Sequence, residues 1–422
     1  MSRFGRWLLL MMVVAFGCRL GAAVARDALV APEGRWERAY EIGSVARALV
    51  DGRGFSDPFL AETGPTAVVG PVQPWVRATL HRLAGSEEKA WPWTIVFELI
   101  VSSLVVGATA LLAREVFDER VALVAAAAMA VHPVLVLAAS GYQGASGLFA
   151  LVVPLVVLAL LRLETADESV RPRAVATLAL LIGLSFWIEP LLVPALGCWW
   201  LTLVVRRRWD LVKTGALAGM AGVLLASPWA VRNTVALGEP TYLRSWGGPE
   251  LWLGALAGPG EPTPIAHHPS RNPGELRRMQ EIGEAAYARE KTAATGRLIA
   301  DDPGRWMASC TWRYGVVWLG RASWWSSVDH PLWSGPASAL RGLAHALPAV
   351  VGLSGLALAW RRRTGRGAGL LLLVLLAQAI VPAMTHVEAR YRQPLESLLV
   401  IGVAAVLVWL GDMIAAGRRR QQ

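Results

Sequence analysis

Long apolar runs recur along almost the whole chain, and each is bounded by charged or small residues. A run of about 20 apolar residues is long enough to cross the hydrocarbon core of a bilayer, so the pattern predicts about ten membrane-spanning helices. The polar positions gather instead into two long segments, residues 26–92 and 232–342. The apolar runs lie at residues 7–25, 94–113, 121–138, 146–161, 174–187, 188–205, 217–229, 344–360, 369–384 and 395–409.

Composition agrees with a membrane protein. Only 17% of the 422 residues are charged, whereas soluble domains carry about 25%. The mean hydropathy is +0.44. We therefore expect an all-α polytopic membrane protein, with a bilayer as its surroundings.

The net charge of +10 is placed in a way that argues against binding of nucleic acid. Arginines gather at alternate ends of the apolar runs, including triplets at 206–208, 361–363 and 418–420. Cytoplasmic loops of membrane proteins carry such an excess of basic residues. The pattern places both termini in the cytoplasm and both polar segments outside. The first run also resembles a signal peptide, ending in AVA at 23–25, but Arg19 favours an uncleaved span.

These signals divide the chain into three parts. Residues 1–231 form an N-terminal transmembrane region that includes the first outer loop, 26–92. Residues 232–342 form a large outer loop, and residues 343–422 form a C-terminal transmembrane region.

The first outer loop contains two short helical patterns. Ile42, Val45 and Leu49 recur at the spacing of an amphipathic helix, which we expect to lie on the membrane with its apolar face toward lipid. A second such helix is expected at 71–85. Glu37 and Glu41 share one face of the first helix, where they are either solvated charges or functional acids. The pattern by itself favours solvated charges.

The large outer loop is expected to form a small helical cap. Met279, Ile282, Ala286 and Tyr287 make a weak apolar stripe along its charged helical stretch. His267 and His268 are adjacent in a proline-rich stretch, a setting that favours solvated side chains over ligands.

Three sequence blocks resemble the GT-C membrane glycosyltransferases, in the correct order. They are YEIGSVARALVDGRGFSDPFLAETGPTAVVGPVQP (40–74), SPWAVRNTVALGEPTYLRSWGGPELWLG (227–254) and EARYRQPLESLLVI (388–401). Within that superfamily the blocks are closest to bacterial protein mannosyltransferase-like and aminoarabinose transferase-like proteins. Each block is moderately specific, and the set with its topology is more so.

The resemblance implies transfer of a sugar from a polyprenyl-phosphate donor to a glycan, lipid or protein acceptor, with inversion. It implies an active site facing the periplasm or exterior, at the cytoplasmic membrane of a bacterium. A carboxylate would act as base on the acceptor hydroxyl, and arginines would stabilise the leaving phosphate. Glu41 matches the family's acid best, with Glu37 as the fallback.

Further residues are expected at the same site. At least one of Arg390 and Arg392 would contact the donor phosphate, Arg232 is a second candidate, and the substrate would meet Asn233, Tyr391 and Gln143. The alternative for Arg390 and Arg392 is that they are span-end arginines reaching toward water. The alternative for Arg232 is that it anchors a loop through backbone carbonyls.

The chain departs from the family at the outer turn 139–149, which contains Gln143 and no carboxylate. A divalent cation held by two acids is therefore not supported, and no cofactor is certain. Glu189, at an outward turn, is expected to pack or to start a helix. Glu98 and His132 lie within apolar runs and should face the interior of the bundle.

Two other functions remain open. A transporter or lipid flippase also needs many spans, although matched halves with broken helices are not evident. A non-catalytic relative that binds polyprenyl lipids is the second alternative.

Overall fold

The computed structural model describes residues 2–32, 41–59, 61–139, 145–262, 264–320 and 337–421. These residues form helices and no strand, apart from one isolated bridge between Ser56 and Pro65. The helices of the bundle are α1 (Arg3–Ala25), α5 (Glu87–Val116), α6 (Glu119–Val131), α7 (Pro133–Ala139), α8 (Ala145–Thr165), α9 (Arg171–Ile188), α10 (Val193–Val205), α11 (Trp209–Leu237), α15 (Pro303–Leu319), α16 (Ala337–Arg362), α17 (Ala368–Gln378), α18 (Ile380–Met384) and α19 (Ala389–Gln421). The remaining α-helices are α3 (Glu41–Val50), α4 (Val72–Ala84), α12 (Gly247–Leu256), α13 (Pro273–Ile282) and α14 (Glu284–Asp301).

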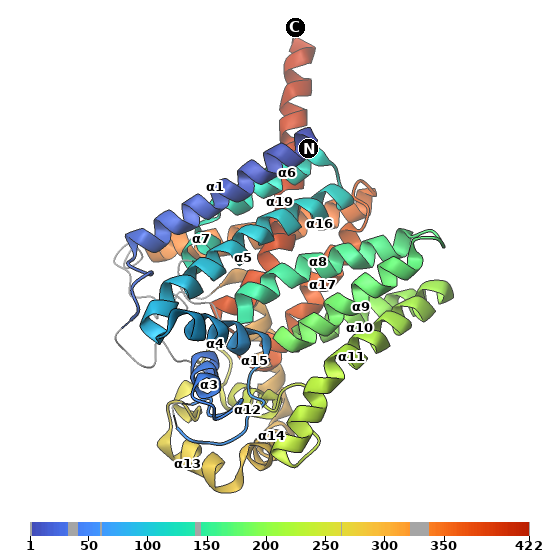
Figure 1. The fold of residues 1–422 in the computed structure, drawn as a ribbon. Helices are drawn as coiled ribbons and strands as arrows, with labels where there is room; N and C mark the ends of the chain where they lie inside the picture. The colour runs from blue at the N-terminus through green and yellow to red at the C-terminus, as the bar shows by residue number, and fades with distance from the viewer. Residues whose placement is uncertain are drawn as a thin grey trace.

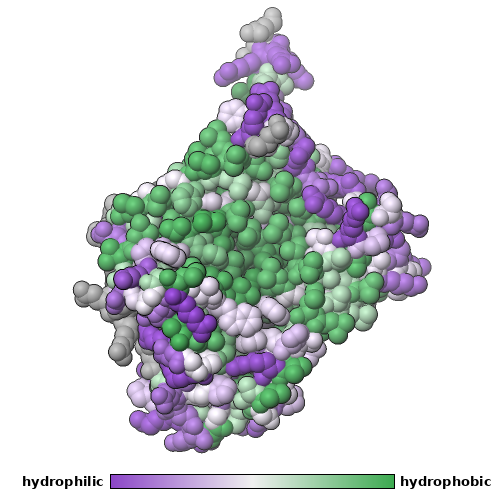
Figure 2. All heavy atoms as spheres, viewed as in Figure 1, coloured by the Kyte–Doolittle hydropathy of each residue, from purple (hydrophilic) through white to green (hydrophobic). Residues whose placement is uncertain are grey.

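The molecule has two layers. The long helices slant across one part, and α3, α12, α13 and α14 gather below them in what we call the cap layer (Figure 1). Both termini lie on the side of the bundle away from the cap layer (Figure 1). A broad apolar belt covers the bundle between more polar ends (Figure 2). This confirms the predicted all-α membrane fold with a helical cap.

The number of spans is best stated from helix length. Within the described residues, six helices are long and apolar enough to cross a membrane, or seven if α6 and α7 form one bent span. Two shorter apolar segments, Pro190–Val205 and Ala368–Met384, lie beside them. The count of about ten spans therefore stays a prediction.

The run at 121–138 is not one helix but two, which are bent by 52°. Pro133 has no N–H and disfavours helical backbone at the preceding residue, so α6 ends at Val131 and His132, which follows it, has a ψ of 114°. The side chain of Arg19, from α1, donates to the carbonyls of Met129 (3.1 Å) and Ala130 (2.9 Å). These are carbonyls that the end of α6 leaves without helical partners.

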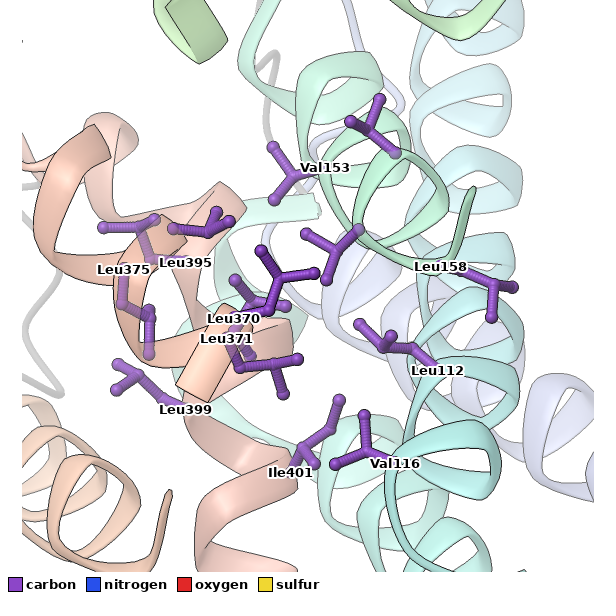
Figure 3. Close-up of a cluster of buried hydrophobic side chains, with 14 of the residues drawn as sticks. Leu112, Val116, Val153, Leu158, Leu370, Leu371, Leu375, Leu395, Leu399 and Ile401 are labelled. Atoms are coloured by element: carbon purple, nitrogen blue, oxygen red, sulfur yellow. The ribbon is translucent and has the colours of Figure 1, made fainter. Parts of the chain in front are cut away.

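The centre of the bundle is packed with aliphatic side chains from α5, α8, α17 and α19 (Figure 3). Leu112, Leu371 and Leu399 are fully buried there. Lipid tails are as apolar as leucine, so close packing rather than exclusion of water holds such helices together. One close approach joins α16 and α19, where a Cβ on Gly402 would lie 2.1 Å from the carbonyl oxygen of Gly352.

The cap layer has its own apolar core. Ile42 and Val45 of α3 pack in one cluster with Trp246, Met279 and Tyr287. The expectation that this face of α3 rests on lipid is therefore wrong, because the large outer loop covers it. The apolar stripe of the large outer loop was correctly identified, and the first outer loop is what it packs against.

Candidate active site

Glu41 is the first residue of α3 and its side chain is 13% exposed. Its Oε1 lies 3.5 Å from Nε2 of His268, in the large outer loop. Burial raises the pKa of Glu41 to about 7, although Arg390 and Arg244 oppose the shift. The first turn of a helix normally favours a carboxylate, so here the loss of hydration outweighs that effect. The result is a carboxyl group that can exchange a proton near neutral pH.

A row of alternating charges continues from Glu41 into the link before α19. Oε2 of Glu250 lies 2.7 Å from Nδ1 of His386, whose Nε2 lies 3.4 Å from Oε1 of Glu388. Oε2 of Glu388 in turn lies 2.7 Å from Nε of Arg390. The hydroxyl of Tyr391 contacts Nε2 of His386 at 3.3 Å. We call Glu41, Glu250, His268, His386, Glu388 and Arg390 the outer cluster.

The charges of the outer cluster follow from these pairs. Burial by itself would lower the pKa of His386, but the carboxylates of Glu250 and Glu388 raise it to about 10. Burial opposes the ionisation of Glu388, yet Arg390 and His386 hold its pKa below the usual range. His386 also holds the pKa of Glu250 down against the effect of burial. Glu250 and Glu388 are therefore carboxylates at pH 7, and Glu41 alone among these acids titrates near neutrality.

Arg244 joins the outer cluster to the first outer loop. Its Nε donates to the carbonyl of Val68 (2.8 Å), and its Nη1 forms an ion pair with Glu189. Glu189 gives no side-chain cap to the 3₁₀ turn that follows it, so pairing with Arg244, not a helix-start role, is what the structure shows. Burial by itself would lower the pKa of Arg244, but the carboxylates of Glu189, Glu250 and Glu41 raise it.

Glu284 holds the first outer loop in place through hydrogen bonds. This carboxylate is 3% exposed and accepts from the hydroxyl of Thr66 (2.5 Å), the amide of Ala67 (2.7 Å) and the hydroxyl of Ser245 (2.6 Å). Three segments of the chain therefore meet at one side chain. The first outer loop also packs closely against the backbone at Gly70, where a Cβ would lie 2.4 Å from the carbonyl oxygen of Trp187.

Arg232 anchors the same loop. It lies within α11, which continues to Leu237, and it donates to the carbonyls of Thr66 (2.5 Å) and Phe55 (2.7 Å). Asn233 is fully buried and donates to the carbonyl of Leu243 (3.1 Å). Both residues thus bind backbone carbonyls, which was the alternative for Arg232, and the substrate contact of Asn233 stays a prediction.

Arg392 is turned away from the outer cluster. It is 2% exposed and donates to the carbonyls of Val317 (3.1 Å), Trp318 (2.9 Å) and His345 (2.8 Å). Its Nε also lies 3.0 Å from Oε1 of Glu396. These acceptors occupy the guanidinium, and a phosphate contact of Arg392 stays a prediction. Arg390 is the arginine of this pair that lies in the outer cluster.

The remaining sequence predictions divide as follows. Tyr391 lies beside His386, at the outer cluster. Glu37 and Gln143 lie outside the described residues. His268 is 4% exposed and not solvated, whereas the neighbouring His267 is exposed. The sequence reasoning missed Glu250, His386 and Arg244, although Arg244 and Glu250 stand inside the second quoted block and Glu388 opens the third.

Two cavities lie close to this region without including Glu41. One is lined by Glu98 and Gln393 between α5, α7, α8 and α19, and has a volume of about 20 Å³. The other lies between α3, α4 and α5 and is lined by Arg47 and Glu87. Among the described residues, no group of three or more His, Cys, Asp or Glu side chains is placed to hold a metal ion.

The chain is similar to known proteins in part of its sequence and in its fold. The family model described as dolichyl-phosphate-mannose-protein mannosyltransferase matches residues 68–231. No curated protein sequence matches this chain. Among solved structures, the apo oligosaccharyltransferase of Archaeoglobus fulgidus aligns with a TM-score of 0.58 and 15% identity, over 98% of this chain and 52% of that one.

Two further solved structures align with this chain. The same oligosaccharyltransferase in complex with Zn and sulfate gives a TM-score of 0.56 and 16% identity, over 97% of this chain and 49% of that one. ArnT from Cupriavidus metallidurans, bound to undecaprenyl phosphate, gives a TM-score of 0.45 and 16% identity, over 96% of this chain and 78% of that one. This chain thus spans about half the length of the oligosaccharyltransferase that it matches.

The fold resembles that of the oligosaccharyltransferase, and residues 68–231, less than half of the chain, match the mannosyltransferase family model. The match begins at Val68, in the loop that Glu284, Arg232 and Arg244 hold in place.

Proposed function

We propose that the protein transfers a sugar from a polyprenyl-phosphate donor to a hydroxyl group of a glycan, lipid or protein acceptor. The family model carries a polyprenol-type phosphate donor, dolichyl phosphate mannose, in its description. The observation that carries the proposal is Glu41, a carboxyl whose pKa burial raises to about 7, set beside the cations of the outer cluster.

The chemistry needs a base, a nucleophile and a stabilised leaving group. Glu41 would take the proton of the acceptor hydroxyl while that oxygen forms a bond to the anomeric carbon. The bond from the anomeric carbon to the phosphate oxygen breaks at the same time, on the opposite face, and the configuration inverts. The electron pair leaves with the polyprenyl phosphate.

Arg390 is the proposed partner of that phosphate. Its guanidinium is about one-third exposed and already faces the carboxylate of Glu388. A guanidinium binds phosphate and carboxylate with the same geometry, so a donor phosphate can share or replace this partner. Arg244 and the protonated His386 add positive charge to the same region.

The proposed place of reaction is the outer face of a bacterial cytoplasmic membrane. The arginine triplets support this, because the positive-inside pattern directs their ends of the helices to the cytoplasm. The cap layer lies on the opposite side of the bundle from the termini (Figure 1).

Replacement of Glu41 by Gln tests the base directly. The amide keeps the shape of the side chain but cannot take a proton, so transfer should fall by a factor of about 10² to 10⁴ while the donor still binds. Transfer would be followed with undecaprenyl-phosphate-linked sugars and membranes of a strain that lacks the protein. Wild-type transfer by Glu41→Gln removes Glu41 from the mechanism.

A second experiment separates transfer from transport. Mass spectrometry of envelope glycans and lipids should show one specific glycosidic linkage that is lost in cells without the protein. A flippase would instead change how a lipid is distributed between the two leaflets, with every linkage still present.

A further inference from the structure

His268 lies where the two outer loops meet. It follows a 3₁₀ turn, Ile265–His267, in the large outer loop, and it is 4% exposed. Its ring packs in T-shaped contacts against two aromatic side chains that also contact each other, with centroid distances of 5.3 Å to Phe59 and 5.5 Å to Trp246. The imidazole is therefore fixed in orientation by packing.

A backbone hydrogen bond determines which ring nitrogen carries the proton. The amide N–H of Ser270 donates to Nδ1 of His268 (3.2 Å), and the hydroxyl of Ser270 also lies 2.6 Å from Nδ1. A backbone amide only donates, so Nδ1 is unprotonated and the hydrogen of the neutral ring is on Nε2. Burial lowers the pKa of His268 to about 4, which keeps the ring neutral at pH 7.

The protonated nitrogen faces the base. Nε2 lies 3.5 Å from Oε1 of Glu41. This is long for a hydrogen bond, and catalytic contacts are often long before the substrate binds. Because the ring is buried against these aromatic side chains and its Nδ1 accepts from Ser270, the geometry directs its one N–H to that carboxylate.

We propose that His268 is the positioning residue of Glu41, donating its Nε2–H to Oε1 so that Oε2 is presented to the acceptor hydroxyl. The inference rests on the proposed function of Glu41 as base. In the transfer step the hydroxyl proton moves to Oε2 of Glu41, and His268 keeps its own proton throughout. The base is then complete only when the large outer loop is docked on the first.

Other charges act on this pair and must be held constant in any test. Arg390, Glu250, Arg244 and Glu388 act on Glu41. Glu250, His386, Glu388 and Arg390 act on His268. A neutral His268 contributes a hydrogen bond and no net charge, so its removal leaves the net charge around Glu41 unchanged.

The first test needs no substrate. Infrared difference spectra recorded during a pH titration of the detergent-solubilised protein report the carboxyl band of Glu41, which Glu41→Gln identifies by its loss. Removing a donor to a carboxylate favours the protonated form, so His268→Ala should raise the pKa of Glu41 above its value of about 7. An unchanged or lower pKa overturns the proposal.

Two matched variants control this measurement. His268→Gln places an amide N–H close to the position of Nε2 and should return the pKa of Glu41 to the wild-type value. His267→Ala removes the exposed neighbouring ring and should leave that pKa and the transfer rate unchanged. If His268→Ala does not fold, a folded His268→Gln decides: the wild-type pKa supports the proposal and a raised one overturns it.

The second test follows transfer itself, with undecaprenyl-phosphate-linked sugars as probes. His268→Ala should lower kcat by about tenfold or more with little change in KM for the donor, and the acidic limb of the pH–rate profile should move to higher pH. A loss of rate with an unmoved limb means that His268 is only structural. If Glu41→Gln is fully active, the proposed function fails; if it is inactive but His268→Ala leaves the Glu41 titration unmoved, only the present inference fails.

Discussion

Two groups of buried charge in this protein differ in what their cations contact. In the outer cluster, Arg390 and the protonated His386 face side-chain carboxylates. Inside the bundle, Arg392 binds three backbone carbonyls and pairs with Glu396, and His132 lies 3.8 Å from the same carboxylate. We call His132, Arg392 and Glu396 the inner cluster.

The difference distinguishes a candidate ligand-binding site, the outer cluster, from a set of structural contacts inside the bundle. Arg392 donates to two buried carbonyls at the end of α15, so its loss would leave buried acceptors with fewer hydrogen bonds. A carboxylate is chemically close to a phosphate, so the partner of Arg390 can be exchanged for a ligand. Buried arginine is therefore no guide to function until its acceptors are known.

The largest effect is expected from a substitution that breaks the inner cluster. Arg392→Met leaves Glu396 as an uncompensated buried charge, and loss of one member of such a pair costs about 3–5 kcal/mol. Thermal unfolding in detergent should show a strongly lowered melting temperature. Arg361→Met, at an exposed position, is the control and should melt like the wild type. An unchanged melting temperature with lost donor binding would return Arg392 to the phosphate site.

Arg390→Ala tests the outer cluster in the same way. Hydrogen bonds to charged groups contribute about 1.5–3 kcal/mol, so the affinity for undecaprenyl phosphate should fall by roughly 10- to 100-fold while the melting temperature stays the same. Arg390→Lys keeps the charge without the planar fork and should be intermediate. Equal affinity in all three proteins would assign Arg390 to anchoring.

Gly70→Ala tests how closely the first outer loop must pack to form the outer cluster. The added methyl would lie 2.4 Å and 2.6 Å from the carbonyl oxygens of Trp187 and Ile188, and overpacking of this kind costs about 1–3 kcal/mol. Transfer should decrease more than stability, because the loop also carries the contact to Arg244. Gly21→Ala, which meets nothing within 4 Å, should have neither effect. If the two variants behave alike, the close approach has no bearing on the site.

The smallest expected effect is the dependence on pH. Glu41 acts as a base only when it is deprotonated, so the rate should rise as the pH increases through about 7, the pKa to which burial raises this group. From the ionised fraction of one group, the rate should differ by about tenfold between roughly pH 6 and 8. Initial rates across this range check the sign. A profile that is flat above about pH 5 would mean that the base is a carboxyl with an ordinary pKa.

The sequence predicts the bundle because hydrophobic length and basic ends are local signals. It predicts the cap stripe of Met279 and Tyr287 for the same reason. Which surface covers an amphipathic helix is not a local property, and Ile42 and Val45 were assigned to lipid although the large outer loop covers them. The bend at His132 had a visible cause in Pro133, yet the hydropathy pattern alone did not reveal it.

The site was predictable only in part. Glu41 and Arg390 stand in blocks that resemble a known family, and the structure brings their charges together. Arg390 and Arg392 share one motif, but residues two apart on an α-helix are related by a rotation of about 200° around the helix axis. Their side chains therefore lie on nearly opposite sides of α19, and only one of them faces the outer cluster. The pairing of Glu250 with His386 joins distant segments, and no spacing in the sequence expresses it.

The convergence of three segments on Glu284 has a consequence for biosynthesis. Its hydrogen bond to Thr66 joins residues 218 positions apart. At chain elongation rates of about 5–20 residues per second, the first outer loop would be synthesised about 10–45 s before its carboxylate partner. During that interval Thr66 and Ala67 lack their native acceptor. Until Glu284 has been synthesised, the first outer loop of the nascent chain is therefore open to proteolysis and to non-native contacts.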